Sequence, residues 1–293
     1  MTEDKDSVLL RSLKAYENDK FLSSPDGRPL RILAEYAEPL SRFRREKIHD
    51  TVVFFGSARF HSLSEAEATM QMLDKPRSAQ PAPAEQADVV RARTAVDMAR
   101  YYEDARRLAY LLTDWSRKIS TKRARFVVTT GGGPGIMEAA NRGAREAGGK
   151  TIGLNISLPY EQLPNRYISP ELNFEFHYFF MRKLWFAYLA KALVVFPGGF
   201  GTLDEMFEIL TLTQTNKLAK KITVLIYGEE YWSKCINLQA LADAGTIAPE
   251  DIKLFRYVNS PEQAFEVLKE DLTRDHLSNP RDPNHHHVET EKE

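Results

Sequence analysis

One stretch of the sequence, residues 194–205, combines the residue types that bind an anion with a carboxylate placed beside it. An apolar run, Val194-Val195-Phe196, breaks into a glycine cluster and then opens an amphipathic helical pattern. This order is typical of a buried parallel strand, a turn that lets backbone approach a ligand, and a helix whose first N–H groups face a phosphate. The anion-binding positions expected from the stretch are Gly198, Gly199, Gly201 and Thr202, and Glu205 follows one turn later.

The same order of strand, glycines and helix occurs at two earlier places in the chain. Residues 126–130 predict a strand that ends in the glycine-rich run 131–135, which contains Gly132 and Gly133. Residues 52–55 predict a first strand that ends in Gly56-Ser57-Ala58-Arg59, a position typical of a ligand-facing loop, in which Gly56 and Ser57 are the expected ligand-binding residues. We therefore expect several strand ends to form one ligand site.

Two common glycine-rich nucleotide motifs are excluded. A dinucleotide fingerprint requires G-x-G-x-x-G and an acidic residue after the next strand, but Ile136 stands at the third glycine position and that strand ends at Asn155. A Walker P-loop requires Gly-Lys-Ser/Thr, which follows neither cluster. The glycines therefore indicate a different nucleotide-binding scheme.

Composition limits the other classes of function. The chain has 293 residues, 43% hydrophobic and 28% charged, with a net charge of −1. Such a balance gives no general attraction to nucleic acid or to an anionic membrane, and favours a small ligand. The single cysteine, Cys235, excludes an internal disulfide, and the histidine positions favour neither a zinc site nor a Ser-His-Asp hydrolase. With no signal-peptide pattern or membrane-spanning run, we expect a cytoplasmic protein.

Alternating strand and helix patterns predict an α/β protein: a Rossmann-like doubly wound parallel sheet with helices on both faces, preceded by an N-terminal helical extension. The expected organisation is an extension at residues 1–50, a nucleotide-binding catalytic domain at 51–275 and a disordered polar tail at 276–293. Within the domain, residues 62–95 are expected to form two partial helices around a mobile, proline-rich break, followed by a long helix from Val96. A strand at 174–179 and a helix at 230–243 are also expected.

Three motifs resemble one known family, the LONELY GUY-type cytokinin riboside 5'-monophosphate phosphoribohydrolases, long mislabelled as lysine decarboxylases. The family's P-G-G-x-G-T-x-x-E motif is met at residues 197–205, its Met-Arg-Lys motif at 181–183, and its glycine-rich loop at 131–138. The resemblance covers roughly residues 50–260, and its bacterial branch is similar over residues 158–214. Glu138 departs from it, because many relatives have glycine there, and Gly135 comes one residue early.

The resemblance implies hydrolysis of the N-glycosidic bond of a nucleoside 5'-monophosphate, AMP or a cytokinin riboside 5'-monophosphate, without metal or organic cofactor. It implies that Arg182 and Glu205 are catalytic and that Lys183 contacts substrate. It also implies a homodimer or larger homo-oligomer, and the aromatic-rich segment 174–188 offers apolar surface for such contacts. A buried carboxylate suits the reaction, since it can stabilise an oxocarbenium ion or activate water.

Several alternatives remain open at this level. Thr202 and Glu205 could form a capping box, Arg182 could be a snorkelling arginine at a helix start, and the loop at 131–135 could be a tight turn without ligand. The whole site could belong to a non-catalytic nucleotide or molybdenum-cofactor carrier. A partner-binding module formed by residues 1–50 and 62–95 could coexist with either function.

Overall fold

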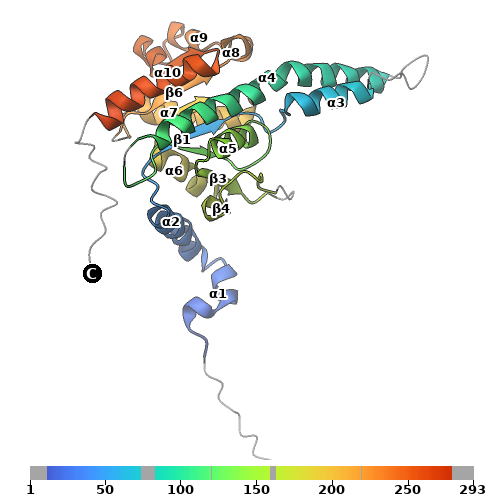
Figure 1. Ribbon diagram of the computed structural model, residues 1–293. Coiled ribbons are helices and arrows are strands. Elements are labelled where there is room, and N and C mark those ends of the chain that lie inside the picture. The colour runs from blue at the N-terminus through green and yellow to red at the C-terminus, as the bar shows by residue number, and fades with distance from the viewer. Residues whose placement is uncertain (1–11, 74–82, 120, 159–162, 219, 279–293) are drawn as a thin grey trace, which may run out of the picture.

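The computed structural model describes residues 12–73, 83–119, 121–158, 163–218 and 220–278. Its centre is a seven-stranded sheet in the order β4-β3-β2-β1-β5-β6-β7, in which every neighbouring pair is parallel (Figure 1). The strands are β1 (Thr51–Phe55), β2 (Val127–Thr130), β3 (Thr151–Ile156), β4 (Asn173–Phe176), β5 (Ala190–Val195), β6 (Thr223–Tyr227) and β7 (Phe255–Val258). The predicted parallel α/β sheet is confirmed.

Helices cover both faces of this sheet, because the strands are apolar on both sides. In β1, Val52 and Phe54 pack into one hydrophobic core, while Val53 and Phe55 pack into the other. The first core contains helices α4 (Pro83–Arg117), α5 (Ile136–Glu146) and α10 (Pro261–Leu272). The second contains α2 (Arg28–Arg45), α6 (Phe179–Leu189), α7 (Phe200–Gln214), α8 (Glu229–Cys235) and α9 (Leu238–Asp243). The doubly wound arrangement is therefore also confirmed.

The topology places the loops that follow β1, β2 and β5 at one edge of the sheet. β1 lies between β2 and β5, and chain order reverses direction on either side of it. Ligands of open α/β sheets bind at such a switch point, beyond the carboxyl ends of the strands. The three predicted glycine loops therefore converge where a ligand site is expected.

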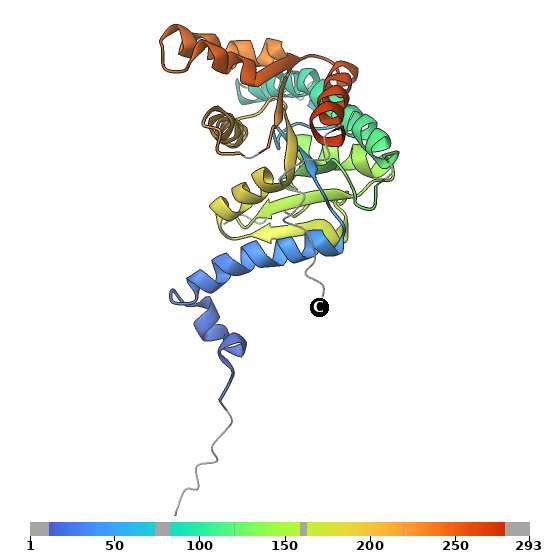
Figure 2. The same cartoon turned by 90° about the vertical axis from the view of Figure 1, so that its left-hand side faces the viewer.

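The N-terminal segment packs against the sheet edge formed by β4. It comprises η1 (Ala15–Glu17), α1 (Asp19–Ser23) and α2, and α2 runs beside β4 (Figure 2). The Glu35 carboxylate accepts hydrogen bonds from the backbone N–H groups of His177 and Tyr178, and the buried Phe43 lies 5.3 Å from the Trp185 ring. The helix α2 therefore packs into the hydrophobic core of the sheet, whereas the sequence predicted residues 1–50 to form an extension separate from the domain.

The region predicted as an insertion has a different form from the one expected. Helix α3 (Leu63–Leu73) lies beside a single 35-residue α4 (Figure 1). α4 already begins at Pro83, where proline is tolerated at the start of a helix, so the expected second partial helix and the helix from Val96 are one element. The predicted proline-rich break lies largely outside the described residues.

Three further boundaries correct the sequence expectations. β4 ends at Phe176, and α6 already starts at Phe179. The strand cannot continue through His177 and Tyr178, because their backbone N–H groups are bound by the Glu35 carboxylate. The helix expected at 230–243 is two helices, separated at Ile236, whose backbone is extended. The tail expected from residue 276 begins later: Thr273–Leu277 (η4) forms a π-helical turn, and residues 279–293 lie outside the described part of the chain.

The remaining short element, η3 (Pro249–Leu254), leads into β7. None of the helices in the described ranges combines the length and the apolar character needed to cross a bilayer.

Candidate active site

A cavity of about 700 Å³ lies at the switch point of the sheet. Its wall combines the loop after β1, the turn between β5 and α7, and side chains from α4, α5, α6 and α8. The predicted site residues that line it are Gly56, Ser57, Arg182, Gly198, Gly199, Gly201, Thr202 and Glu205. The volume is within the range of pockets that hold a nucleotide-sized ligand.

Arg182 and Glu205 meet in the wall of this cavity. Arg182 Nη1 lies 3.6 Å from Glu205 Oε1, and only 13% and 10% of the two side chains are exposed. Arg182 Nε also donates a hydrogen bond of 2.7 Å to the Leu154 carbonyl, which fixes the guanidinium. The arginine is therefore buried and directed at the carboxylate, and the snorkelling alternative is wrong.

Burial controls the protonation of this pair. Desolvation raises the pKa of Glu205 to about 7, and the nearby Arg182 and Lys183 charges only partly oppose this. Desolvation also lowers the pKa of Arg182, although an arginine remains charged at any working pH. A carboxyl group that titrates near neutrality in a cavity is typical of an acid or base catalyst.

The start of α7 presents backbone donors to the cavity. Gly199 is the N-cap, Phe200 begins the helix, and no side chain caps it. The first N–H groups of a helix have no partner within it, and the helix dipole favours an anion there. A Cβ atom at Gly199 or Gly201 would meet nothing within 4 Å, so the missing side chains leave this space open.

The capping-box alternative is excluded by where α7 begins. Thr202 is already inside the helix, three residues beyond the N-cap, so it cannot cap it. The Glu205 carboxylate lies against Arg182 instead of reaching back to the helix start. Helix capping therefore does not explain why the Glu205 side chain is buried.

The absence of a side chain at Gly131 leaves the space that the Arg182 guanidinium occupies. A Cβ atom at Gly131 would lie 2.5 Å from Arg182 Nη2 and 2.8 Å from Met137 Sδ. This glycine has no left-handed backbone, so the requirement comes from the contact and not from φ.

Replacing Gly131 with alanine is expected to lower kcat/KM about 100-fold for the hydrolysis that the family resemblance implies. The added methyl group displaces the guanidinium, and if Arg182 is catalytic, as the family resemblance implies, misplacing it by about 1 Å costs this much. Steady-state assays measure the loss, and thermal melting monitored by circular dichroism checks that the variant is folded. Wild-type kinetics in a folded Gly131→Ala variant would contradict this assignment.

The other glycines of the same loop have structural contacts and do not line the cavity. The Gly132 carbonyl accepts hydrogen bonds from Asn165 N and Nδ2, and the Gly133 carbonyl accepts one from Asn165 Nδ2. Gly132 also has a φ of 79°, which favours glycine. The alternative of a tight turn thus describes this part of the loop, and ligand contact by Gly132 and Gly133 stays a prediction without support from the geometry.

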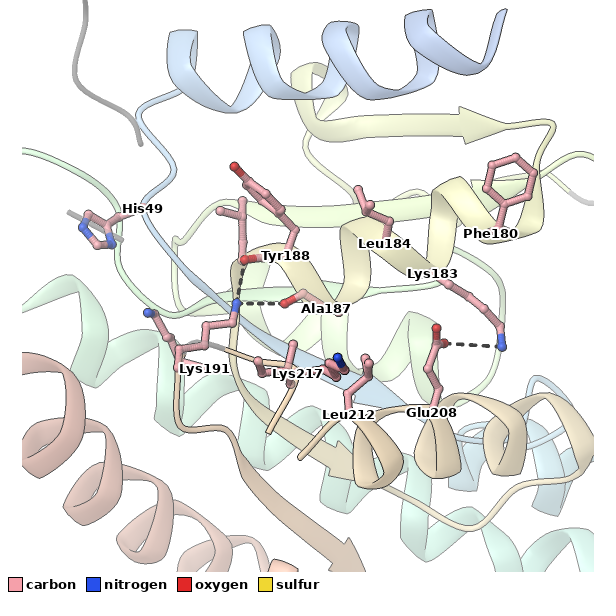
Figure 3. A pocket seen from close by; sticks show the side chains of 13 residues that line it. His49, Phe180, Lys183, Leu184, Ala187, Tyr188, Lys191, Glu208, Leu212 and Lys217 are labelled. Atoms are coloured by element: carbon pink, nitrogen blue, oxygen red, sulfur yellow. Dashed lines mark hydrogen bonds and ion pairs between the residues drawn. The ribbon is translucent and has the colours of Figure 1, made fainter. Parts of the chain in front are cut away.

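Lys183, predicted to contact substrate, is not among the residues that line this cavity. Its Nζ is 2.8 Å from Asp204 Oδ1 and 3.4 Å from Glu208 Oε2. It lines a second cavity of about 410 Å³, where Figure 3 shows it directed at Glu208. Neighbouring residues on a helix point about 100° apart, and here Arg182 lines the first cavity while Lys183 lines the second.

The cavity also contains residues that sequence patterns did not identify. Arg59 is the last residue of the predicted ligand-facing loop 56–59, although it was not named as a site residue, and Phe60 follows that loop directly. Thr94 and Met98 come from α4, and Tyr231 from α8, where its hydroxyl donates a 3.0 Å hydrogen bond to the Gly198 carbonyl. No local pattern marks these three positions.

Two other residues considered from the sequence lie elsewhere. Glu138, which departs from the family pattern, accepts a 3.0 Å hydrogen bond from the Tyr102 hydroxyl and does not line the cavity. His177 is exposed beside α2. Across the residues described, no three His, Cys, Asp or Glu side chains form a group that could hold a metal ion.

The family model and the curated relatives that match this chain point to one protein family. A family model described as "possible lysine decarboxylase" matches residues 137–268. Cytokinin riboside 5'-monophosphate phosphoribohydrolase LOG5 of Arabidopsis thaliana is 25% identical over 49% of this chain and 62% of its own length, so the match spans less than two thirds of that relative. The enzyme of the same name from Rhodococcoides fascians is 30% identical over 45% of this chain and 67% of its own.

Among solved structures, the molybdenum cofactor binding protein of Rippkaea orientalis aligns with a TM-score of 0.44 at 18% identity. The alignment covers 76% of this chain and 98% of that one. The sequence relatives, and the bacterial one above all, show that the chain belongs to the LONELY GUY-type family of cytokinin riboside 5'-monophosphate phosphoribohydrolases.

Proposed function

We propose that this protein hydrolyses the N-glycosidic bond of a nucleoside 5'-monophosphate, releasing a free base and ribose 5-phosphate. The proposed substrates are AMP and the cytokinin riboside 5'-monophosphates, of which only the latter stand in the names of the relatives. The observation that carries the proposal is the buried Arg182 and Glu205 pair, 3.6 Å apart, in the same cavity wall as the open start of α7.

The carboxylate suits the charge that develops in this reaction. Breaking the bond from ribose to base places positive charge on the ribosyl carbon and ring oxygen. An ionised Glu205 in a desolvated wall stabilises that charge or removes a proton from the attacking water. Arg182 favours the ionised form and limits how far burial raises the pKa of Glu205.

The phosphate would bind at the first turn of α7. The N–H groups of Phe200, Gly201 and Thr202 belong to that turn and have no acceptor within the helix. The open space at Gly199 and Gly201 allows phosphate oxygens to reach the backbone. The same arrangement would direct the ribose toward Glu205, which lies on the same helix.

A panel of nucleoside 5'-monophosphates, including AMP and isopentenyladenosine monophosphate, tests the proposal. We expect free base to be released from at least one of them, detected by reversed-phase chromatography, and no release from the matching nucleosides lacking phosphate. Binding of nucleotides without any release would instead indicate a nucleotide or cofactor carrier.

We further propose that the protein forms a homodimer through the exposed apolar surface of α6 and α7. Phe179, Phe180 and Leu184 on α6 are more than a third exposed, as is Phe207 on α7, and Phe200 is 93% exposed. Phe180 and Leu184 border the cavity between these helices (Figure 3). Large apolar side chains gathered on one surface are typical of an interaction site.

Light scattering coupled to size-exclusion chromatography is expected to give twice the mass of one chain at micromolar concentration. Phe180→Asp is expected to shift the population toward monomer, because it places a charge in the apolar contact. The exposed substitution Leu33→Asp on α2 is the matched control and should leave the mass unchanged. A monomeric wild-type protein would rule out the dimer.

A further inference from the structure

One arginine in the cavity lining, Arg59, has a guanidinium without a partner among the residues that the structure describes. Two arginines line it, and Arg182 is already bonded to the Leu154 carbonyl and paired with Glu205. The Arg59 guanidinium, in contrast, has no ion pair or hydrogen bond with any residue in the described ranges. It is also exposed, so it is free to approach a ligand.

The backbone that carries Arg59 is fixed next to the proposed phosphate site. Ser57 N donates a 2.9 Å hydrogen bond to the Pro197 carbonyl, immediately before the glycine turn. The Ser57 carbonyl accepts a 3.0 Å bond from Ile136 N, and the Ser57 hydroxyl accepts one of 3.1 Å from Arg59 N. The loop after β1 is thus tied both to the β5–α7 turn and to the start of α5.

Among the charged residues of the cavity wall, Arg59 is the cation that is available to a phosphate. Arg59, Arg182 and Glu205 are its charged lining residues, and Glu205 balances Arg182 when ionised. A phosphate monoester carries nearly two negative charges near pH 7, whereas a helix start supplies only about half a positive charge. Lys183 cannot make up the difference, because Asp204 and Glu208 hold its ammonium group outside the cavity.

We propose that Arg59 binds the phosphate group of the ligand, together with the backbone N–H groups at the start of α7. A guanidinium offers two parallel donors to phosphate oxygens, and its charge does not depend on pH in the working range. The identity of the ligand as a nucleotide rests on the proposed function. The phosphate contact itself requires no hydrolysis.

Ribose 5-phosphate, a proposed product that the protein does not consume, is the probe. Isothermal titration calorimetry with wild type, Arg59→Gln and Arg59→Lys measures its affinity. We expect Arg59→Gln to weaken binding at least 10-fold, as for loss of a charge-assisted hydrogen bond. Arg59→Lys should restore part of this loss, because it keeps the charge but not the planar pair of donors.

Arg93→Gln is the matched control, since Arg93 is an exposed arginine of α4 outside the cavity lining. Its affinity for ribose 5-phosphate should equal that of wild type, and the melting temperature of Arg59→Gln should also be unchanged. Equal affinities of Arg59→Gln and wild type would overturn the proposal, as would a wild-type protein that does not bind ribose 5-phosphate.

The two proposals fail in different ways. Absence of base release together with ribose 5-phosphate binding that falls in Arg59→Gln would remove the hydrolase function and support the Arg59 contact. Base release together with binding that does not depend on Arg59 would support the function and remove the contact.

Discussion

The Glu205→Gln variant is expected to release base from AMP about 1000-fold more slowly than wild type at saturating substrate. Glutamine matches the shape of glutamate but carries no charge, so it can neither stabilise the oxocarbenium ion nor accept a proton from water. Positioned acid or base groups typically contribute 100- to 10,000-fold. Because the proposed phosphate donors at the start of α7 are unchanged, AMP should still bind within a few-fold of the wild-type affinity.

Asp204→Asn is the matched control for this loss. Asp204 is adjacent in sequence, but its carboxylate pairs with Lys183 and does not line the cavity. Its kcat should stay within about twofold of wild type, since single-site surface changes leave the active-site geometry intact. Equal kcat values for Glu205→Gln and wild type would remove Glu205 from the mechanism.

The same variant should also alter how stability depends on pH. The raised pKa of Glu205, about 7 against 4.5, means that between these values the native state holds a proton that the unfolded state has lost. The free energy of unfolding should therefore fall as pH rises through this window, by up to about 3 kcal/mol from this group. Glu205→Gln should remove that decrease, which urea unfolding at pH 5 and pH 8 can measure.

Replacing Arg182 with methionine is expected to have the second large effect, a shift of the pH profile of kcat/KM toward higher pH. Without the guanidinium, Glu205 is a buried carboxylate with no adjacent counter-ion, so its pKa rises above the value of about 7. If the ionised form is active, the wild-type rate increases through pH 7. The increase in Arg182→Met should come at least one pH unit later, with a rate at pH 7 about 100-fold lower.

Arg182→Lys is the control for charge alone. It keeps a cation near Glu205 while losing the bond from Nε to the Leu154 carbonyl, so its profile should rise near the wild-type pH at a reduced maximum. A series of rates from pH 5.5 to 9.5 distinguishes these cases. A wild-type rate that falls through pH 7 would assign Glu205 as a general acid instead.

Much of the architecture was contained in local patterns. The strands β1 (Thr51–Phe55) and β2 (Val127–Thr130) lie within one residue of the ranges 52–55 and 126–130 that the sequence predicted, because short apolar runs followed by glycine mark them directly. The glycine clusters after β1, β2 and β5 likewise marked the edge of the sheet where the cavity lies. These signals arise from interactions between residues close in sequence.

Local patterns failed where a residue's role depends on distant parts of the chain. Aromatic residues at 177–179 favoured a strand, but the Glu35 carboxylate of α2 binds the two N–H groups that precede α6. The spacing of Thr202 and Glu205 fitted a capping box, although α7 begins earlier, at Phe200. In the first case a tertiary contact decided between conformations that the local sequence allows.

The sequence by itself determined a parallel α/β sheet, the glycine turn at 197–202 that we propose binds phosphate, and the presence of Arg182 and Glu205 near it. Only the tertiary structure decided that Arg182 faces Glu205 while Lys183 faces Asp204, and that Arg59 and Tyr231 share the cavity wall. The physical reason is that secondary structure follows from periodicity along the chain, whereas the direction of a side chain and the burial that raises the pKa of Glu205 depend on the packing of whole helices.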